Sequence, residues 1–277
     1  MALSVALSPV SSSLWVQAEG WNQFSGLIHG FSGRITERPF ALSRLQTETL
    51  PLYTLKQVHS DEILTVSQES ETNVRPEADG MISGESGVLL GIATADCVPV
   101  LMVAPQYGLV AALHAGWRGT LKGISQRAIR ILDEQWGIAP KCIWIALGPS
   151  ISRCCYEVGR EVGEPFQERW GATEVWQAKG EKGFLDLRAV NHIQCEEAGV
   201  PSLQIQSVGP CTFCASSDFA SYRREGAGAG RQLSVIGWQK DSSIETVGEI
   251  PPIPPFSKGG TKISPLVKGT ARSARGF

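Results

Sequence analysis

The sequence has 277 residues with 25 basic and 27 acidic side chains, which gives a formal net charge of −2. A chain of this length can bury most of the surface that it exposes when unfolded, so it needs no disulfides to fold. The even balance of charge argues against nucleic acid or an anionic membrane as a partner, and no apolar run approaches the length of a membrane span. Seven cysteines, an odd number at irregular spacing, indicate reduced thiols in the cytoplasm.

The first part of the chain is typical of a sheet-rich protein, with short apolar runs between turns. We interpret 1–15 as containing a first strand rather than a signal peptide, because it has no basic region. Segment 86–104 contains two β-rich runs around a Thr-Ala-Asp-Cys turn. The continuous apolar runs 108–116 and 142–150 predict buried strands.

In the second half of the sequence, apolar residues recur at the spacing typical of helices. The pattern predicts a helix over 120–137, with Thr120 as its N-cap and Gly137 as its stop. Further helices are expected over 158–171 and 184–200. Late strands are expected at 203–209 and 232–238. The fold class is therefore mixed α/β, with β-sheets flanked by helices.

The composition changes near residue 240. The segment 241–277 is rich in Pro, Gly, Ser and Lys and has no helical or strand period. Such a segment cannot bury enough apolar surface to offset the entropy of ordering it. We therefore expect one catalytic domain over 1–240 and a disordered tail over 241–277.

Three residues suggest a metal site. His59 ends a short amphipathic run, Cys97 follows a predicted strand, and His114 ends another. Two imidazoles and one thiolate suit zinc, and three protein ligands leave the fourth tetrahedral position open, as in catalytic sites. Their spacing matches no short zinc motif. It is also compatible with a buried cysteine beside two hydrogen-bonded histidines, or with a metal-free Cys97–His114 nucleophile–base pair.

An anion site is a second expectation. The predicted helix start at Thr120 would offer free N–H groups and a positive dipole end. Arg118, in the preceding loop, can add charge-assisted hydrogen bonds to a phosphate. Asp96, next to Cys97, fits a turn carboxylate that caps backbone N–H groups, a proton shuttle, or a carboxylate that orients one of the ligand histidines.

The remaining cysteines have a structural interpretation. Cys211 and Cys214 form a Cys-x-x-Cys pair, but no second pair follows them, so a structural zinc would have too few ligands. We interpret this pair as structural thiols. Four other cysteines are expected to fill space in or near the core: Cys142, Cys154, Cys155 and Cys195.

Nine motifs in one order resemble those of the laccase-domain, YfiH-type family, also labelled polyphenol oxidase or purine nucleoside phosphorylase. They are HGFSGR (29–34), KQVHS (56–60), EADGMIS (77–83), TADCVPVLM (94–102), HAGWRGT (114–120), GPSISRCCYEVG (148–159), FLDLRAVN (184–191), CTFC (211–214) and FASYRREG (219–226). The resemblance covers roughly residues 10–238.

The resemblance implies a single α/β domain with mixed sheets and a zinc site at His59, Cys97 and His114. It also implies phosphorolysis of adenosine, inosine and methylthioadenosine, together with adenosine deamination. One departure is that HGFSGR runs into ITERPF, where the family has a Gly-Gly turn. The loop after Arg34 is therefore expected to differ.

Phosphorolysis passes through an oxocarbenium-like transition state, so phosphate must be held near the ribose C1′. Arg34, Arg118 and Thr120 are the candidates for binding it. The expected partners are small nucleosides and phosphate. An alternative is a copper-dependent polyphenol oxidase, but four histidines are too few for several coppers. A second alternative is a metal-free Cys–His hydrolase, because the family's fold is similar to that of a bacterial toxin deamidase that uses a Cys–His pair. A third alternative is a non-catalytic protein that kept the fold.

Overall fold

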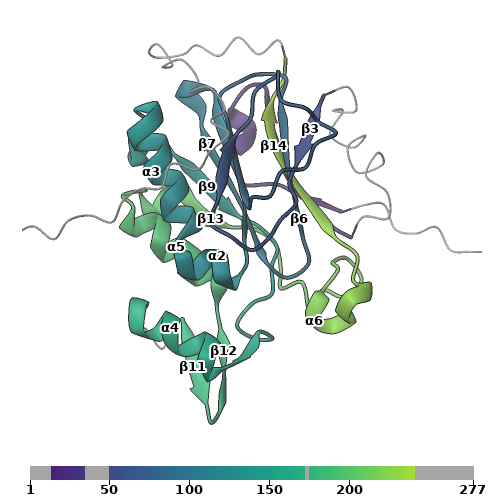
Figure 1. Ribbon diagram of the computed structural model, residues 1–277, viewed down its shortest axis with the longest axis vertical. Coiled ribbons are helices and arrows are strands. Elements are labelled where there is room, and N and C mark those ends of the chain that lie inside the picture. The colour runs from purple at the N-terminus through teal and green to yellow at the C-terminus, as the bar shows by residue number, and fades with distance from the viewer. Residues whose placement is uncertain (1–13, 35–49, 172–174, 241–277) are drawn as a thin grey trace, which may run out of the picture.

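The computed structural model describes residues 14–34, 50–171 and 175–240. The expected tail 241–277, most of the N-terminal segment and the loop after Arg34 lie outside these residues. Within them, the mixed α/β fold is confirmed, and it has three layers: helices, a six-stranded sheet and a five-stranded sheet (Figure 1).

The six-stranded sheet forms the middle layer. Its strands, in spatial order, are β13 (Ile205–Ser207), β9 (Trp144–Leu147), β7 (Val98–Ala104), β8 (Leu109–Ala115), β5 (Gly80–Ser83) and β4 (Ile63–Thr65). The predicted apolar runs over 86–104 and 108–116 are confirmed as strands. Every residue of β7 and β8 is buried, because this sheet is covered on both faces, which explains their continuous apolar sequences.

The five-stranded sheet packs on one face of the middle layer. Its strands, in spatial order, are β1 (Trp15–Val16), β2 (Leu27–Ser32), β14 (Gln232–Trp238), β6 (Leu89–Thr94) and β3 (Leu52–Thr54). Leu90 and Ile236 of this sheet pack with Leu101 and Val110 of the middle sheet in one apolar cluster. The strand expected at 232–238 is confirmed, and it lies in the centre of its sheet.

Helices cover the other face of the middle sheet (Figure 1). They are α2 (Trp117–Lys122), α3 (Ile124–Trp136) and α5 (Leu187–Glu197). Ile124 and Leu132 of α3 and Val190 of α5 pack on Val100 and Leu113. The apolar stripe of each helix therefore faces the sheet, as the period predicted.

The predicted helix over 120–137 is wrong at its start and in its continuity. Helix α2 begins at Trp117, with Gly116 as its N-cap, so Thr120 lies inside it. Gly123 then takes a left-handed conformation, with φ of 84°, and separates α2 from α3. A helical period alone does not reveal such a break, because the apolar spacing continues across it.

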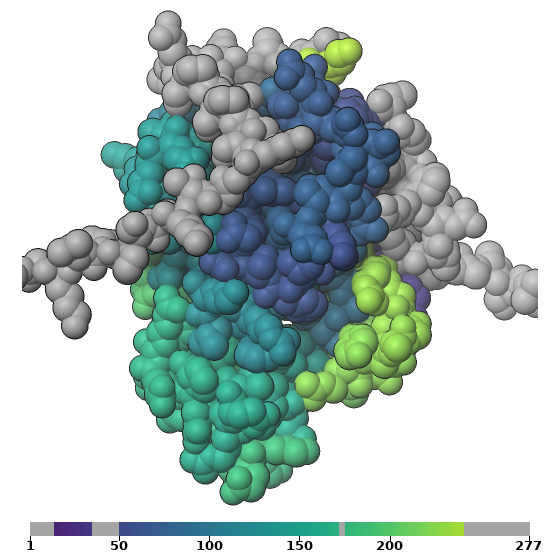
Figure 2. Space-filling model, viewed as in Figure 1, coloured from purple at the N-terminus to yellow at the C-terminus, as the bar shows by residue number. Residues whose placement is uncertain are grey.

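A smaller lobe projects from one end of the molecule (Figure 1). It combines α4 (Arg160–Trp170) with the antiparallel strands β10 (Glu157–Gly159), β12 (Lys182–Leu185) and β11 (Trp176–Lys179). A short helix, α6 (Tyr222–Glu225), lies at the lower right in Figure 1, on the opposite side of the molecule from α4. The space-filling view shows the surface hollowed between the teal segment and the yellow-green segment that contains α6 (Figure 2).

Short 3₁₀ turns complete the described elements. They are η1 (Trp21–Gln23), η2 (Pro105–Tyr107), η3 (Pro140–Cys142), η4 (Ser202–Gln204) and η5 (Gly226–Gly228). Over the described ranges, no helix has both the length and the hydropathy needed to cross a bilayer.

Candidate functional site

His59, Cys97 and His114 meet in space. One ligand atom from each lies within 4.8 Å of the others. The two imidazole rings are 4.8 Å apart between centroids and nearly perpendicular, at 79°. The convergence expected from the sequence is therefore observed, and the group could hold a metal ion.

Sheet pairing brings Cys97 to His114. Strands β7 and β8 are antiparallel neighbours, with Val98 opposite Ala115 and Pro99 opposite His114. The start of β7 therefore lies beside the end of β8, and Cys97 immediately precedes β7. A separation of 17 residues along the chain becomes a contact across the sheet edge.

Gly116 keeps the space between the ligands open. A Cβ atom at this position would lie 2.8 Å from Cδ2 of His59 and 3.2 Å from Sγ of Cys97. The first distance is shorter than any ordinary carbon–carbon contact. Glycine is required here because the backbone between β8 and α2 passes directly against both side chains.

Asp79 orients two of the three side chains. Its buried carboxylate contacts Nδ1 of His114 at 2.7 Å, which leaves the Nε2 atom of that ring for a ligand. The same carboxylate accepts hydrogen bonds from the backbone N–H groups of Val58, His59 and Ser60 and from the Ser60 hydroxyl. A histidine whose second nitrogen bonds a carboxylate is a recurring arrangement at metal sites.

The loop that carries His59 depends on these bonds. His59 has a φ of 60°, a conformation that residues other than glycine rarely adopt. The three amides bound by Asp79 stabilise that conformation. Asp79 carries no recognisable functional signal in the sequence except its place directly before a buried strand, where a charged residue needs specific partners.

The electrostatics favour a thiolate beside an imidazolium. Burial by itself raises the pKa of the Cys97 thiol, but the charges and hydrogen bonds of His114 and His59 outweigh it and lower that pKa to about 6. Burial likewise opposes the charged form of His114, yet Cys97 and Asp79 raise its pKa to about 9. Asp79 keeps a pKa of about 2, because its hydrogen bonds with His114 and Ser60 outweigh its burial.

Asp96 is a capping carboxylate. It accepts hydrogen bonds from the hydroxyls of Thr212 and Ser221 and from the backbone N–H of Arg223, at the start of α6. Of the interpretations from the sequence, the capping carboxylate is therefore confirmed, although the capped N–H group comes from a distant segment. Asp96 joins the turn before Cys97 to the C-terminal segment.

The predicted anion-binding residues have different surroundings. Arg118 is exposed on α2, its guanidinium stacks 4.2 Å over the Trp117 ring, and it makes no ion pair within the described residues. Arg34 instead makes a bidentate ion pair with Glu225, at 2.6 and 2.8 Å, and also donates to the carbonyl of Phe219.

The surroundings of Thr120 do not fit its predicted role as the start of a helix that binds phosphate. Its side chain is fully buried, its hydroxyl accepts from Asn191, and its N–H bonds the carbonyl of Gly116 inside α2. Neither group is available to a phosphate. The helix starts at Trp117 and not at Thr120, so Thr120 is no longer a candidate for binding phosphate.

Tyr156 is close enough to Cys97 for their charges to interact. Burial and the nearby charge of Cys97 raise its pKa to about 12, and the guanidinium of Arg223 lies 5.2 Å from its ring centroid. The phenol therefore stays protonated at neutral pH and can donate a hydrogen bond.

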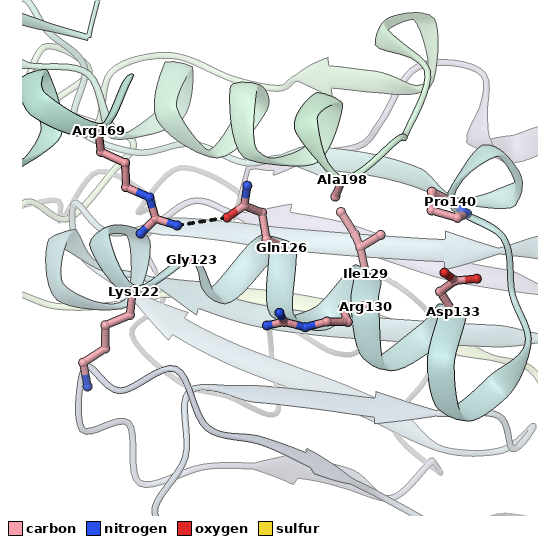
Figure 3. Close-up of a pocket in the computed structure, with 9 residues that line it drawn as sticks. All are labelled: Lys122, Gly123, Gln126, Ile129, Arg130, Asp133, Pro140, Arg169 and Ala198. Carbon is pink, nitrogen blue, oxygen red and sulfur yellow. Dashed lines mark hydrogen bonds between the residues drawn. The ribbon is translucent and has the colours of Figure 1, made fainter. Parts of the chain in front are cut away.

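A cavity of about 540 Å³ lies elsewhere, on the helical layer, and contains none of the predicted site residues (Figure 3). Its lining includes Gln126, Arg130 and Arg169.

Comparison with known proteins gives consistent results. The family model described as "Multi-copper polyphenol oxidoreductase laccase" matches residues 36–239. A protein named purine nucleoside phosphorylase YlmD, from Geobacillus stearothermophilus, is 36% identical over 201 residues, which cover 67% of this chain and 72% of the relative. A protein named adenosine deaminase RL5, from an unknown prokaryotic organism, is 31% identical over 236 residues, which cover 79% of this chain and 90% of the relative.

Solved structures share the fold. The crystal structure of YlmD from Geobacillus stearothermophilus superposes with a TM-score of 0.76 at 29% identity and covers 82% of this chain and 97% of that one. The crystal structure of the Bacillus licheniformis hypothetical protein YfiH gives a TM-score of 0.74 at 27% identity, with the same coverage.

Proposed function

This chain belongs to the family described as multi-copper polyphenol oxidoreductase laccases, and on that basis we propose that it is a zinc-dependent purine nucleoside phosphorylase with adenosine deaminase activity. It would convert adenosine, inosine or methylthioadenosine and phosphate into the free base and a ribose 1-phosphate product. Relatives named purine nucleoside phosphorylase and adenosine deaminase support both activities.

The observation that carries this proposal is the convergence of His59, Cys97 and His114 around one point, with Asp79 behind His114. Two imidazoles and one thiolate fit zinc in chemistry and number. When bound, zinc supplies Lewis-acid chemistry at the coordination position that three protein ligands leave open. Copper also accepts such ligands, so metal analysis of the purified protein must decide between the two metals.

The protein's own groups then have separate tasks. We assign phosphate binding to Arg118, because its exposed guanidinium has no competing carboxylate in the described structure. Tyr156 would donate a hydrogen bond to the ribose or the base. Arg34 is a weaker candidate for phosphate, since Glu225 already neutralises it.

Four histidines do not suffice for a four-electron copper oxidase, and one of them, His29, is buried and donates no ligand atom to the group at Cys97. The conversion of adenosine needs no electron transfer. We therefore favour group transfer over oxidation, despite the description of the family.

One observation favours a second candidate, a metal-free hydrolase. Asp79, His114 and Cys97 are arranged like an acid–base–nucleophile triad, with the pKa of the thiol lowered to about 6. Such a triad has no need of His59, whereas a metal site does. The two functions therefore differ in what the His59→Ala substitution does.

The deciding experiment incubates the protein with adenosine and phosphate and separates adenine, ribose 1-phosphate and inosine by chromatography. Both His59→Ala and His114→Ala should lower the rate more than about 100-fold, because a lost ligand costs at least as much as a lost ligand-orienting group. His192→Ala, a histidine on α5 that pairs with Glu196, is the matched control.

Equal product release by wild type and His114→Ala would overturn the phosphorylase. Amide hydrolysis that survives His59→Ala but not alkylation of Cys97 would establish the hydrolase in its place. We also propose that the enzyme acts in the cytoplasm, where its seven cysteines stay reduced, and that it needs neither nucleic acid nor membrane.

A further inference from the structure

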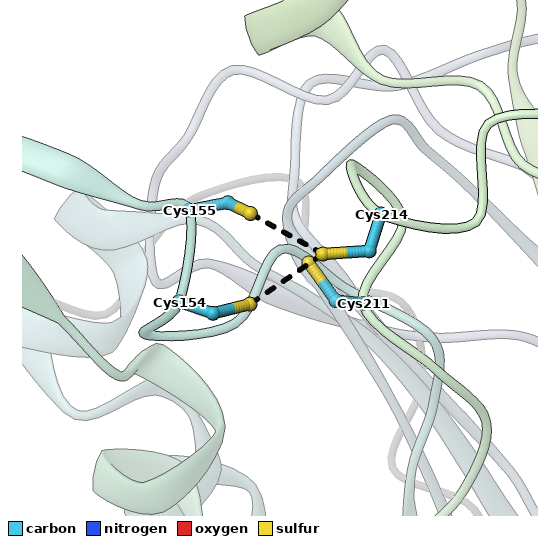
Figure 4. Close-up of side chains that lie close together, drawn as sticks. All are labelled: Cys154, Cys155, Cys211 and Cys214. Carbon is cyan, nitrogen blue, oxygen red and sulfur yellow. Dashed lines mark hydrogen bonds between the residues drawn. The ribbon is translucent and has the colours of Figure 1, made fainter.

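A second group of ligating side chains lies apart from His59, Cys97 and His114. Cys154 and Cys155 come from the turn that follows β9, and Cys211 and Cys214 come from the turn that follows β13. Their four Sγ atoms lie within 4.8 Å of one another. The side chains of the two turns point toward a common centre (Figure 4).

The sulfur separations match a tetrahedral metal site. Sγ of Cys214 lies 3.4 Å from that of Cys155 and 3.7 Å from that of Cys154. Four sulfurs bound to one zinc at about 2.3 Å occupy tetrahedral corners about 3.8 Å apart. Bonded disulfide sulfurs lie about 2.0 Å apart, and all four thiols are free. A four-iron cluster would spread the sulfurs farther, because each then binds a different iron atom.

Backbone contacts hold the two turns in register. The N–H of Thr212 donates to the carbonyl of Ser150 at 3.1 Å, and Ser150 forms a parallel bridge with Cys211. The N–H of Ser152 donates to Sγ of Cys211 at 3.4 Å. An N–H group aimed at a cysteine sulfur stabilises the negative charge that the sulfur carries as a metal ligand.

An arginine supports the second turn. The Arg224 guanidinium donates to the carbonyls of Thr212 and Phe213, between Cys211 and Cys214, at 2.9 and 2.7 Å. Arg188 likewise donates to the carbonyl of Pro210. These bonds fix the backbone that aims the sulfurs, and they place positive charge next to a group that would be negative overall with zinc bound.

We propose that Cys154, Cys155, Cys211 and Cys214 form a closed tetrathiolate site for one structural zinc ion. Four protein ligands leave no position for substrate, so the role of this ion is structural. The expectation that Cys211 and Cys214 lack partners is wrong, because the second pair precedes them by 56 residues instead of following them.

The zinc would brace the neighbourhood of Cys97. The turn with Cys154 donates the N–H of Ile151 to the carbonyl of Asp96 at 2.9 Å. The turn with Cys211 donates the Thr212 hydroxyl to the Asp96 carboxylate at 2.7 Å. Both turns therefore contact the residue next to Cys97, and a metal that joins them stabilises that residue's position.

The test uses His114→Ala protein, purified without added metal. Elemental analysis should find one zinc per chain, and X-ray absorption should find only sulfur ligands, at about 2.3 Å. This variant lacks one of the ligands assigned to the substrate site. The measurement reads metal content and ligand type, so it does not depend on the nucleoside activity. Failure of that activity therefore leaves this proposal untouched.

Cys214→Ser should lose one zinc equivalent relative to wild type, because Cys214 contacts both members of the other pair. Cys142→Ser, at a free cysteine outside the cluster, should retain it. If Cys214→Ser does not fold, the ligand identity in His114→Ala still decides. No metal in His114→Ala, iron in place of zinc, nitrogen or oxygen ligands, or disulfides among the four cysteines of reduced protein would each overturn the proposal.

Discussion

The Asp79 carboxylate contacts both the ring of His114 and the backbone of His59, so one buried charge positions two candidate ligands. Asp79→Asn keeps the size of the side chain but removes the negative charge. We expect the affinity for zinc at this site to fall about 10–100-fold, as for other groups that orient a ligand. Competition with a chromogenic chelator measures this affinity.

Asp133→Asn, at an exposed position of α3, is the control and should leave the affinity unchanged. A folded Asp79→Asn protein with wild-type zinc affinity would show that His114 and His59 hold their positions without this carboxylate.

Glu225 makes stability depend on pH. Its hydrogen bonds with Arg34 and Arg224 outweigh the effect of burial and lower its pKa from 4.5 to about 2. Since the folded-state pKa lies below the unfolded one, the stabilisation is complete above pH 4.5 and is lost as the pH falls toward 2. We expect Glu225→Gln to have a lower urea midpoint than wild type at pH 6.

The difference between the two midpoints should shrink steadily between pH 4.5 and pH 2, because protonation then removes the charge from wild type as well. A difference that is the same at pH 6 and pH 3 would mean that the Glu225 charge contributes nothing to folding.

Single residues show what sequence can and cannot reveal. The motif resemblance located His59, Cys97 and His114, because their residue types are distinctive. It did not reveal the role of Asp79, whose partners are mostly backbone N–H groups. It also missed the pairing of Cys154 and Cys155 with Cys211 and Cys214, since the parallel pairing of β9 and β13 brings together two turns that are 56 residues apart.

Secondary-structure elements were predicted well where apolar period and length agreed. The strands β6, β7, β8 and β14 and the helix α5 lie within their predicted ranges. The helix expected from residue 120 failed at its start because Thr120 lies inside α2, where it faces inward and is hydrogen-bonded to Asn191. A tertiary hydrogen bond of this kind leaves no periodic trace in the sequence.

The break between α2 and α3 depends on Gly123. Its φ of 84° costs any other residue about 1–2 kcal/mol, and a Cβ there would lie 3.0 Å from Oε1 of Gln126. We expect Gly123→Ala to lower the free energy of unfolding by about 1–2 kcal/mol, measured by urea denaturation. Gly228→Ala, where an added Cβ meets nothing within 4 Å, should change it by less than about 0.5 kcal/mol.

Equal stability of the Gly123→Ala and Gly228→Ala proteins would mean that α2 and α3 can join into the single helix that the sequence pattern suggested.

At the scale of the whole molecule, the flank of β14 is hydrogen-bonded to the body at two residues: the N–H of Gln239 donates to the carbonyl of Gly26, and the Ser86 hydroxyl donates to the carbonyl of Lys240. The composition of the sequence predicts a boundary at residue 240. We therefore expect a chain that ends after Lys240 to keep its melting temperature within about 2 °C and its activity unchanged. Circular dichroism during heating measures the melting temperature, and the adenosine assay measures the activity.

A chain that ends after Arg231 is the comparison. It lacks β14, which pairs with both β2 and β6, and should not fold. A large loss of stability on removing 241–277 alone would instead place that segment within the folded unit.

The position of β14 also constrains how the protein is made. This strand emerges from the ribosome after every other described strand, yet it fills the slot between β2 and β6. Until then the nascent chain carries two facing strand edges with unsatisfied N–H and C=O groups, which other chains can pair with. Slow translation of the segment that contains β14, or a shortage of chaperones, should therefore promote aggregation of the nascent chain.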